Sequence, residues 1–275
     1  MTPVALTLVG GPTVVLELGA LRLVTDPTFD GPGRFPVGTR HLVKTKGPAL
    51  TPDAVGPVDA VLLSHDQHPD NLDRLGRQLI ERVPITFTTR AAAGRLDGNV
   101  VGLDPWQSAT VLDRCGLRYT ITGVPARHGP PGAESLAGPV IGFVVEGPGT
   151  PRTYVSGDNA SLGLVAQVRA RTGRPELAVL FAGAARTPLM NGANLTLTSE
   201  DGVRAAEILD AEHVVVVHTD GWAHFSEDAA SVTAAFARTS TADRLVDLQP
   251  GVRVPIPWPA RPIGSPPDPA AGSRS

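Results

Sequence analysis

The sequence predicts a mixed α/β protein, and two observations carry that prediction. Four apolar, β-branched runs each end in a polar cluster containing histidine or aspartate, as expected for buried strands followed by loops. Both halves of the chain also show strands first and helices afterwards, which is typical of sheets covered by helices. Because 275 residues suffice for one layered core, we expect a single domain over residues 1–254.

The first half opens with β-branched runs that are separated by glycine-containing turns. These runs predict an antiparallel meander with strands at residues 4–9, 13–18 and 21–24. A Gly- and Pro-rich stretch then covers residues 30–57. It is too long for a plain connection between elements, so we expect a functional loop there.

A further strand is expected at residues 59–64, followed directly by a polar cluster and a helix. Apolar residues at helical spacing indicate the helix, namely Leu72, Leu75, Leu79 and Ile80. The polar cluster therefore joins the end of a strand to a helix, and it reads His65-Asp66-Gln67-His68-Pro69-Asp70-Asn71.

The second half repeats the order of strands before helices. Strands are expected at residues 119–124, 140–145, 152–156, 177–181 and 214–217. Helices are expected at residues 162–171, after Thr198, where Asp201 completes a capping pair, and at residues 227–239. Three of these strands end near a histidine or an aspartate, so their loops can bring polar groups to one edge of a sheet.

The composition is that of a globular protein whose core rests on small aliphatic residues. Apolar residues make up 41% of the chain, charged residues 19% and aromatic residues only 4%. A formal net charge of −3 and a pI near 6.2 argue against nucleic acid as the main partner. No apolar run approaches the roughly 18 residues that span a bilayer, so we expect no membrane segment.

Cys115 is the only cysteine and lies in a predicted turn, so no intrachain disulfide can form, which fits a cytoplasmic location. The amino terminus alternates like a strand and lacks the pattern of a signal peptide. Residues 255–275 are dominated by Pro, Gly, Ala and Ser, and we expect a disordered tail there. A homo-oligomer is compatible with these features.

His65, His68 and Asp70 have a spacing that one loop can fold around a metal ion or a close pair of ions. Imidazole and carboxylate groups suit Zn²⁺, and alternatively Mn²⁺ or Fe²⁺. The competing interpretation is structural: Asp70 or Asn71 caps the following helix while the histidines are solvated.

Three further ligand candidates follow other strands, namely His128, Asp158 and His218. A lone histidine is more often structural, and an aspartate in this setting can be an Asx-turn residue instead. His224 lies soon after His218 and is an additional candidate, with Trp222 between them as a pocket wall or a packing residue. His41 on the long loop stays outside this ligand set.

These stretches resemble the metallo-β-lactamase-fold hydrolases, specifically the branch similar to the bacterial ascorbate-phosphate lactonases. The resemblance spans about residues 4–250 and rests on four matching pieces: residues 61–73, Pro125-Ala126-Arg127-His128-Gly129-Pro130, Tyr154-Val155-Ser156-Gly157-Asp158, and Val217-His218 through His224-Phe225. It implies a four-layer αββα sandwich with metal at one edge. It also implies that His65, His68 and His128 hold one ion, that Asp70 and His218 hold a second, and that Asp158 bridges the two.

The chain departs from the family's His-x-His-x-Asp-His pattern in two ways. His68 is displaced by one residue, and Asn71 stands where the last imidazole is expected. Asn71 is a possible additional ligand, but asparagine binds zinc poorly, so the second ion is held weakly, is held with His224 or water instead, or is absent. Both one and two ions per chain are compatible with this pattern.

The site predicts a metal-dependent hydrolase of a small molecule. A divalent ion lowers the pKa of its bound water to about 7, and the metal-bound hydroxide is expected to attack an ester, lactone, amide or phosphodiester. Asp158 is expected to lie beside the hydroxide, Asp70 to orient the water or accept its proton, and His218 or His224 to steady the developing anion.

Basic residues are available to meet an anionic substrate, namely Arg34, Lys44, Lys46 and Arg127. The alternative from another class is a noncatalytic metal-binding or ligand-sensing protein with a degenerate second metal site. Nucleic-acid processing is a third option, which the acidic balance and the lack of a basic run disfavour.

Overall fold

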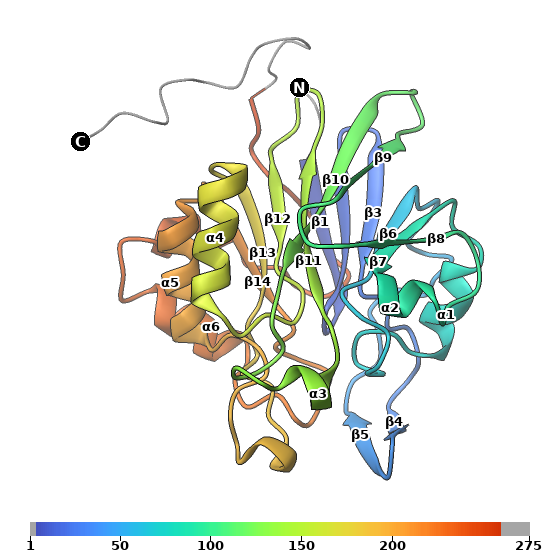
Figure 1. Cartoon of the computed structure of the whole chain (residues 1–275). Helices are drawn as coiled ribbons and strands as arrows, with labels where there is room; N and C mark the ends of the chain where they lie inside the picture. The colour runs from blue at the N-terminus through green and yellow to red at the C-terminus, as the bar shows by residue number, and fades with distance from the viewer. Residues whose placement is uncertain (1–3, 260–275) are drawn as a thin grey trace.

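The computed structural model of the chain describes residues 4–259, and in it two β-sheets pack face to face with helices on both outer sides (Figure 1). This arrangement is the αββα sandwich that the resemblance implies, and it confirms the predicted fold class. The labels of Figure 1 are used below.

The first sheet has seven strands, and the meander expected at its start is confirmed. The parallel strands β6, β7 and β8 continue the sheet from β3. In spatial order the strands are β15 (Arg253–Pro255), β1 (Val4–Gly10), β2 (Thr13–Leu18), β3 (Leu21–Thr25), β6 (Ala60–Leu62), β7 (Thr86–Thr89) and β8 (Val100–Leu103).

The second sheet has six strands, and four of them end at the same edge. Strands β12, β13 and β14 are parallel to one another, and β11 is antiparallel to both of its neighbours, so β10 runs in the same direction as β12. In spatial order the strands are β14 (His213–Val217), β13 (Leu177–Phe181), β12 (Thr153–Val155), β11 (Ile141–Glu146), β10 (Arg118–Pro125) and β9 (Ser108–Leu112).

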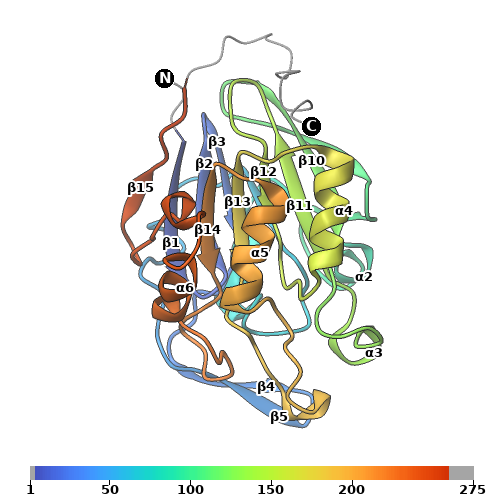
Figure 2. The same ribbon diagram turned by 90° about the vertical axis from the view of Figure 1, so that its left-hand side faces the viewer.

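Helices form the two outer layers (Figure 1), one of which faces the viewer in Figure 2. The helix that begins after Thr198 has the expected capping box, because Thr198 and Asp201 each accept a hydrogen bond from the other's backbone N–H. The first sheet is covered by α1 (Arg74–Ile80) and α2 (Arg90–Ala93), and the second by α4 (Leu162–Thr172), α5 (Ser199–Leu209) and α6 (Ala229–Phe236). The short α3 (Glu134–Ala137), η1 (Pro188–Met190) and η2 (Ala242–Arg244) lie in connections.

The sequence alternates so that each sheet buries both faces. Leu6, Leu16 and Leu23 point between the sheets, whereas their neighbours Val15 and Val24 pack toward the outer layer of the first sheet. Burying one such side chain fully is worth roughly 1.5–3 kcal/mol, so these contacts fix how the sheets are stacked. The strand ends that carry polar residues are therefore held rigidly.

The stretch at residues 30–57 differs from the predicted loop, because it contains the hairpin of β4 (Gly33–Val37) and β5 (Arg40–Lys44). Gly38 adopts a φ of +57° in the two-residue turn, a conformation that favours glycine. The hairpin is mostly exposed, which gives it little apolar patterning and hides it from a sequence-based prediction.

The packed region extends beyond residue 254, where the domain was predicted to end. Ile256 and Trp258 are buried against the inner core, and the backbone N–H of Ile256 donates to the carbonyl of Val4 over 2.8 Å. Two large apolar side chains at strand spacing explain this extension. The rest of the predicted tail, residues 260–275, lies outside the described residues. Within residues 4–259, every helix is too short or too polar to cross a membrane.

Candidate metal centre

Four polar residues lie just past strand ends that meet at one edge between the two sheets. His65 follows β6 of the first sheet, whereas His128, Asp158 and His218 follow β10, β12 and β14 of the second. Because parallel strands end at the same edge, residues up to 153 positions apart in the chain are brought together. The convergence predicted from the sequence is present.

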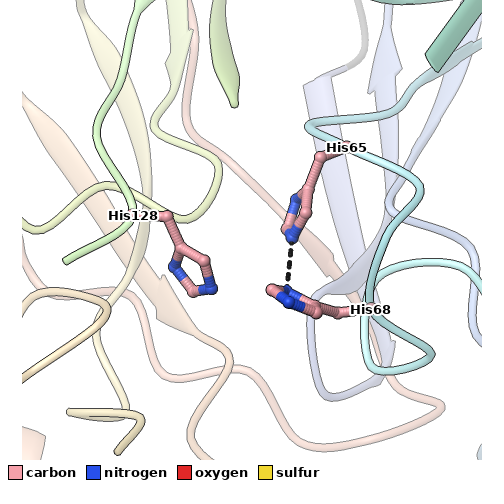
Figure 3. A group of neighbouring side chains, drawn as sticks. All are labelled: His65, His68 and His128. Carbon is pink, nitrogen blue, oxygen red and sulfur yellow. Dashed lines mark hydrogen bonds between the residues drawn. The ribbon is translucent and has the colours of Figure 1, made fainter. Parts of the chain in front are cut away.

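His65, His68 and His128 form one cluster, in which the three rings point toward one another (Figure 3). A ring nitrogen of each lies within 4.8 Å of those of the other two. His65 Nε2 and His68 Nδ1 are 2.9 Å apart, and the His65 and His128 ring centroids are 5.3 Å apart. Although His68 is shifted by one residue from the family pattern, its ring still lies in the cluster.

Asp70, Asp158 and His218 form a second cluster of buried side chains. His218 Nε2 lies 3.4 Å from Asp70 Oδ2 and 3.7 Å from Asp158 Oδ1. Asp158 also lies 3.6 Å from His128 Nδ1, so it stands between the two clusters. This is the position at which a carboxylate can bridge two ions.

Hydrogen bonds behind the first cluster orient its rings. His128 Nδ1 lies 2.9 Å from the carbonyl of Leu195, which accepts the Nδ1 hydrogen and leaves Nε2 with a free lone pair. Ser64 Oγ lies 2.9 Å from His65 Nδ1 and donates to Asp26 Oδ2 at 2.6 Å. Asp26 was missed in the sequence, although it follows β3, the parallel neighbour of β6.

Asn71 serves as a donor between two carboxylates, while its Oδ1, the atom that could bind a metal, is buried without a hydrogen-bond partner among residues 4–259. Its Nδ2 donates to Asp26 Oδ2 at 2.9 Å and to Asp158 Oδ1 at 3.1 Å. The proposed capping by Asp70 or Asn71 is wrong, because Asp73 caps α1 by accepting from the Gly76 backbone N–H.

His224 lies beside the second cluster. Its Nε2 is 3.0 Å from Asp70 Oδ2, and its ring is only 4.6 Å from that of Phe225, measured between centroids. His224 is therefore a fourth side chain at the second cluster, within reach of the Asp70 carboxylate, as the sequence allowed. His213, in contrast, lies on β14 away from the clusters, with Nε2 3.2 Å from the carbonyl of Pro257.

The electrostatics of the site differ between its imidazoles. At His218 burial lowers the pKa, but the carboxylates of Asp158 and Asp70 outweigh it, so the pKa lies above its usual value. Burial lowers the pKa of His128 to about 4 and that of His65 well below its usual range. Burial alone raises the pKa of Asp70, but His224 and His218 outweigh this and hold it well below its usual range. Burial and the nearby Asp158 raise the pKa of Asp26 to about 7.

The residues present fit a bound divalent cation. Several buried polar atoms of the site have no hydrogen-bond partner among the described residues: Asp70 Oδ1, Asp158 Oδ2, His218 Nδ1 and His218 Nε2. Leaving such atoms unpaired is costly, and a cation held by the two carboxylates and one nitrogen of His218 would satisfy three of the four. The backbone of His218 also adopts a φ of +63°, a strained conformation that is often found at functional sites.

A cavity of about 490 Å³ opens above the clusters, with His68, Asp70, His128 and His224 at its floor. Its basic side chains are Arg40 and Arg186, neither of which was predicted from the sequence, and His41 lines it too. Arg40 begins β5 in the exposed hairpin and Arg186 lies in the connection between β13 and η1, and both segments lack apolar periodicity, so only their charge marks them.

The basic residues proposed for an anionic substrate do not line this cavity. Lys44 is buried in an ion pair with Asp73 at 3.2 Å, and Trp222 is buried beside Lys44 as a packing residue. Arg127 Nε donates to the carbonyl of Gly129, and Arg34 is exposed elsewhere on the hairpin. Lys46 lies by Trp222, outside the site.

Comparison with known proteins identifies relatives at the level of the fold. An isothiocyanate hydrolase from Delia radicum gut bacteria matches with a TM-score of 0.77 at 21% identity, over 94% of this chain and 100% of its own. A metallo hydrolase from Ignicoccus hospitalis matches with a TM-score of 0.69 at 17% identity, over 94% and 100%. The diiron β-hydroxylase CmlA from Streptomyces venezuelae matches with a TM-score of 0.64 at 14% identity, over 92% and 54%.

A search of curated proteins gave no match. The family model of the beta-lactamase superfamily domain matches residues 21–219, which is more than half of the chain and includes both clusters. With the αββα sandwich and the two clusters at one edge of its sheets, this chain therefore belongs to the metallo-β-lactamase superfamily.

Proposed function

We propose that this protein is a metal-dependent hydrolase of a small molecule, acting on an ester, lactone, amide or phosphodiester. One observation carries the proposal: two clusters of imidazoles and carboxylates, with unpaired buried atoms, form the floor of an open cavity. Ligand sites of this kind are concave and carry a few convergent polar groups. Resemblance to the ascorbate-phosphate lactonase branch supports a lactone as one of the substrates to test.

His65, His68 and His128 are proposed to hold one ion, and Asp70, Asp158 and His218 a second, with Zn²⁺ favoured and Mn²⁺ or Fe²⁺ as alternatives. A bound divalent ion supplies a water of lowered pKa and polarises the substrate carbonyl or phosphoryl group. The second group has three protein side chains, and His224 is its nearest further imidazole.

The chain's own residues position the reactants. The Leu195 carbonyl fixes the tautomer of His128, and Asp26 and Ser64 orient His65. Asp70 stays ionised and is proposed to orient the attacking water or accept its proton. For an ester, the acyl–oxygen bond breaks, the water oxygen bonds the acyl carbon, and the leaving alcohol takes up the proton.

A noncatalytic metal-binding or ligand-sensing protein is the second candidate. Asn71 favours it, because an amide that donates to Asp158 replaces an imidazole and weakens the second group as an ion site. Both candidate functions predict metal binding, but only the hydrolase predicts substrate turnover.

The test compares the wild-type protein with His65→Ala and Asp158→Ala variants, using His213→Ala as a matched control outside the site. Metal content per chain is measured after purification without chelators. Turnover is measured on a p-nitrophenyl ester, a homoserine lactone, bis-p-nitrophenyl phosphate and, because of the similar Delia radicum protein, benzyl isothiocyanate.

We expect metal and turnover in the wild type and in His213→Ala, and a loss of both in His65→Ala and Asp158→Ala. Turnover that persists in fully metal-free wild-type protein would contradict the proposal. Stoichiometric metal without turnover of any of these substrates would favour the noncatalytic candidate instead.

A further inference from the structure

The cavity above the metal centre is built from three segments that are far apart in the chain. The β4–β5 hairpin forms one side, the segment around η1 forms the other, and α3 closes the cavity between them. The hairpin and the η1 segment touch, because Arg40 Nη1 donates to Thr187 Oγ1 at 3.1 Å. The upper part of the cavity is thus formed by elements outside the two sheets.

Its upper walls are apolar and open to solvent. Leu136 on α3 is 60% exposed and Leu189 on η1 is 57% exposed, and both line the cavity with Met190 and Leu195. These side chains add apolar surface to a concave site, and a cavity with apolar walls and a few polar groups is typical of ligand binding. These walls suit a flexible or aromatic hydrocarbon group.

The charges of the cavity are separated by depth. Asp70 at the buried floor is the only acidic residue of the lining, whereas Arg40 and Arg186 lie at the exposed mouth. Neither arginine forms an ion pair within residues 4–259: Arg40 bonds the Thr187 hydroxyl, and Arg186 Nε donates to Asn194 Oδ1 at 2.8 Å. Each guanidinium keeps further N–H donors for another partner.

An oxyanion is the partner that these donors fit. Guanidinium groups bind carboxylates and phosphates through charge-assisted, often paired hydrogen bonds. An anion held by the arginines avoids the buried Asp70, and the apolar side chains line the same cavity. The ligand must therefore be long enough to join a charged end at the mouth to a reactive group at the floor.

We propose that the substrate is an amphiphilic anion, with an apolar body between Leu136 and Leu189, an oxyanion held by Arg40 and Arg186, and its scissile bond at the metal centre. This inference rests on the proposed hydrolase function and names the chemical class of its substrate. The oxyanion is a carboxylate or a phosphate, since both fit the same donors.

Two esters of matched length test the proposal in the metal-loaded enzyme: p-nitrophenyl hydrogen suberate, whose acyl chain ends in a carboxylate, and p-nitrophenyl octanoate, whose chain ends in a methyl group. We expect the wild type to favour the charged ester by about tenfold or more in kcat/KM, the size of one charge-assisted bond. The double variant Arg40→Gln/Arg186→Gln should lose this preference, because its kcat/KM should fall much further for the suberate than for the octanoate.

Two further variants separate the contributions of charge and hydrocarbon. Arg34→Gln, on the same hairpin but outside the cavity, should retain the preference. Leu189→Ser should lower kcat/KM for both esters by the same factor, so the ratio of the two kcat/KM values should stay unchanged. A wild type without preference, a double variant that retains it, or an Arg34→Gln variant that loses it would overturn the proposal.

Calorimetric titration with hexanoate, hexyl phosphate and hexanol tests the inference without turnover. Arginine-dependent binding of either anion, with hexanol unaffected by the double variant, supports the inference, and the tighter anion identifies the charged group. If no ester is hydrolysed but the anions still bind through the arginines, the hydrolase proposal fails while the ligand class stands. Equal binding of the anions to the wild type and the double variant would overturn the ligand class.

Discussion

Asn71 decides the character of the second cluster at the scale of a single residue. Its amide donates to Asp26 and Asp158, two buried carboxylates that would otherwise repel each other. The amide hydrogens thus meet both carboxylates from the position where the family pattern has its last imidazole. Its side-chain oxygen has no partner among the described residues, which is the cost of this arrangement.

An Asn71→His substitution is expected to tighten the second ion site by about tenfold or more, since it adds an imidazole beside Asp158. Metal content after exhaustive dialysis should rise toward two ions per chain. The control is Asn99→His, which adds an imidazole at an exposed position. If the stoichiometry of Asn71→His equals that of the wild type, Asn71 does not limit the second site.

At the scale of elements, the ends of β13 and β14 pack so closely that they fix the position of His218. A Cβ atom at Gly183, just past β13, would overlap the backbone carbonyl of His218. This contact explains why a glycine stands there and how His218 is held in its strained conformation.

Gly183→Ala is therefore expected to cost roughly 2–3 kcal/mol of unfolding free energy and to weaken metal binding, because the His218 backbone must shift. Gly163→Ala on α4 is the matched control, as its Cβ would meet only Ser161 Oγ at 3.7 Å. The control should stabilise the protein by roughly 0.5–1 kcal/mol, as alanine favours a helix. Denaturant unfolding of both variants measures these changes. Equal unfolding free energies for Gly183→Ala and Gly163→Ala would contradict the predicted contact.

Glu17 joins three strands of the first sheet. Its carboxylate on β2 accepts from Arg22 Nη2 on β3 at 2.8 Å and from Arg253 Nε on β15 at 2.6 Å. Burial alone raises the pKa of Glu17, but the two arginines outweigh it, so the pKa lies below the ordinary value of 4.5. The two ion pairs of Glu17 stabilise the folded protein at pH values above the unfolded-state pKa of Glu17. This stabilisation is lost as the pH falls through the folded-state pKa.

Glu17→Gln should thus lower the unfolding free energy by about 0.5–1 kcal/mol at pH 7, a modest value because Arg253 is half-exposed. The difference from the wild type should shrink as the pH falls below 4.5. Urea denaturation at pH 7 and at low pH measures it. A difference that is unchanged at low pH would show that charge does not cause the effect.

At the scale of the whole molecule, the metal centre joins the two sheets. His65, His68 and Asp70 come from the first sheet's edge, whereas His128, Asp158 and His218 come from the second. An ion bound to both sides stabilises only the stacked arrangement of the sheets, so metal binding and folding are coupled.

Chelation should therefore lower the Tm of the wild type. With free metal at a thousand times its Kd, binding contributes about 4 kcal/mol, which corresponds to roughly 10 °C for a chain of this size. Calorimetric scans with Zn²⁺ and with EDTA measure the shift. The His65→Ala variant should show little dependence on chelator, and a wild type that melts equally in both would contradict the coupling.

The sequence was most informative where local chemistry repeats. The meander, the strand before His65 and the capping box at Thr198 follow from apolar periodicity and turn residues, which act over a few positions. The exposed β4–β5 hairpin lacks such a pattern, and Ile256 and Trp258 were hidden in a segment rich in proline and glycine.

By itself, the sequence determined which residue types follow the buried strands, and hence that imidazoles and carboxylates gather at one sheet edge. Only the tertiary structure decided that Asp26 supports His65 through Ser64, that Asn71 donates to Asp158, and that Arg40 and Arg186 share a cavity. The physical reason is range: periodicity and turn chemistry act between neighbours in the chain, whereas these contacts depend on how two sheets and distant loops pack.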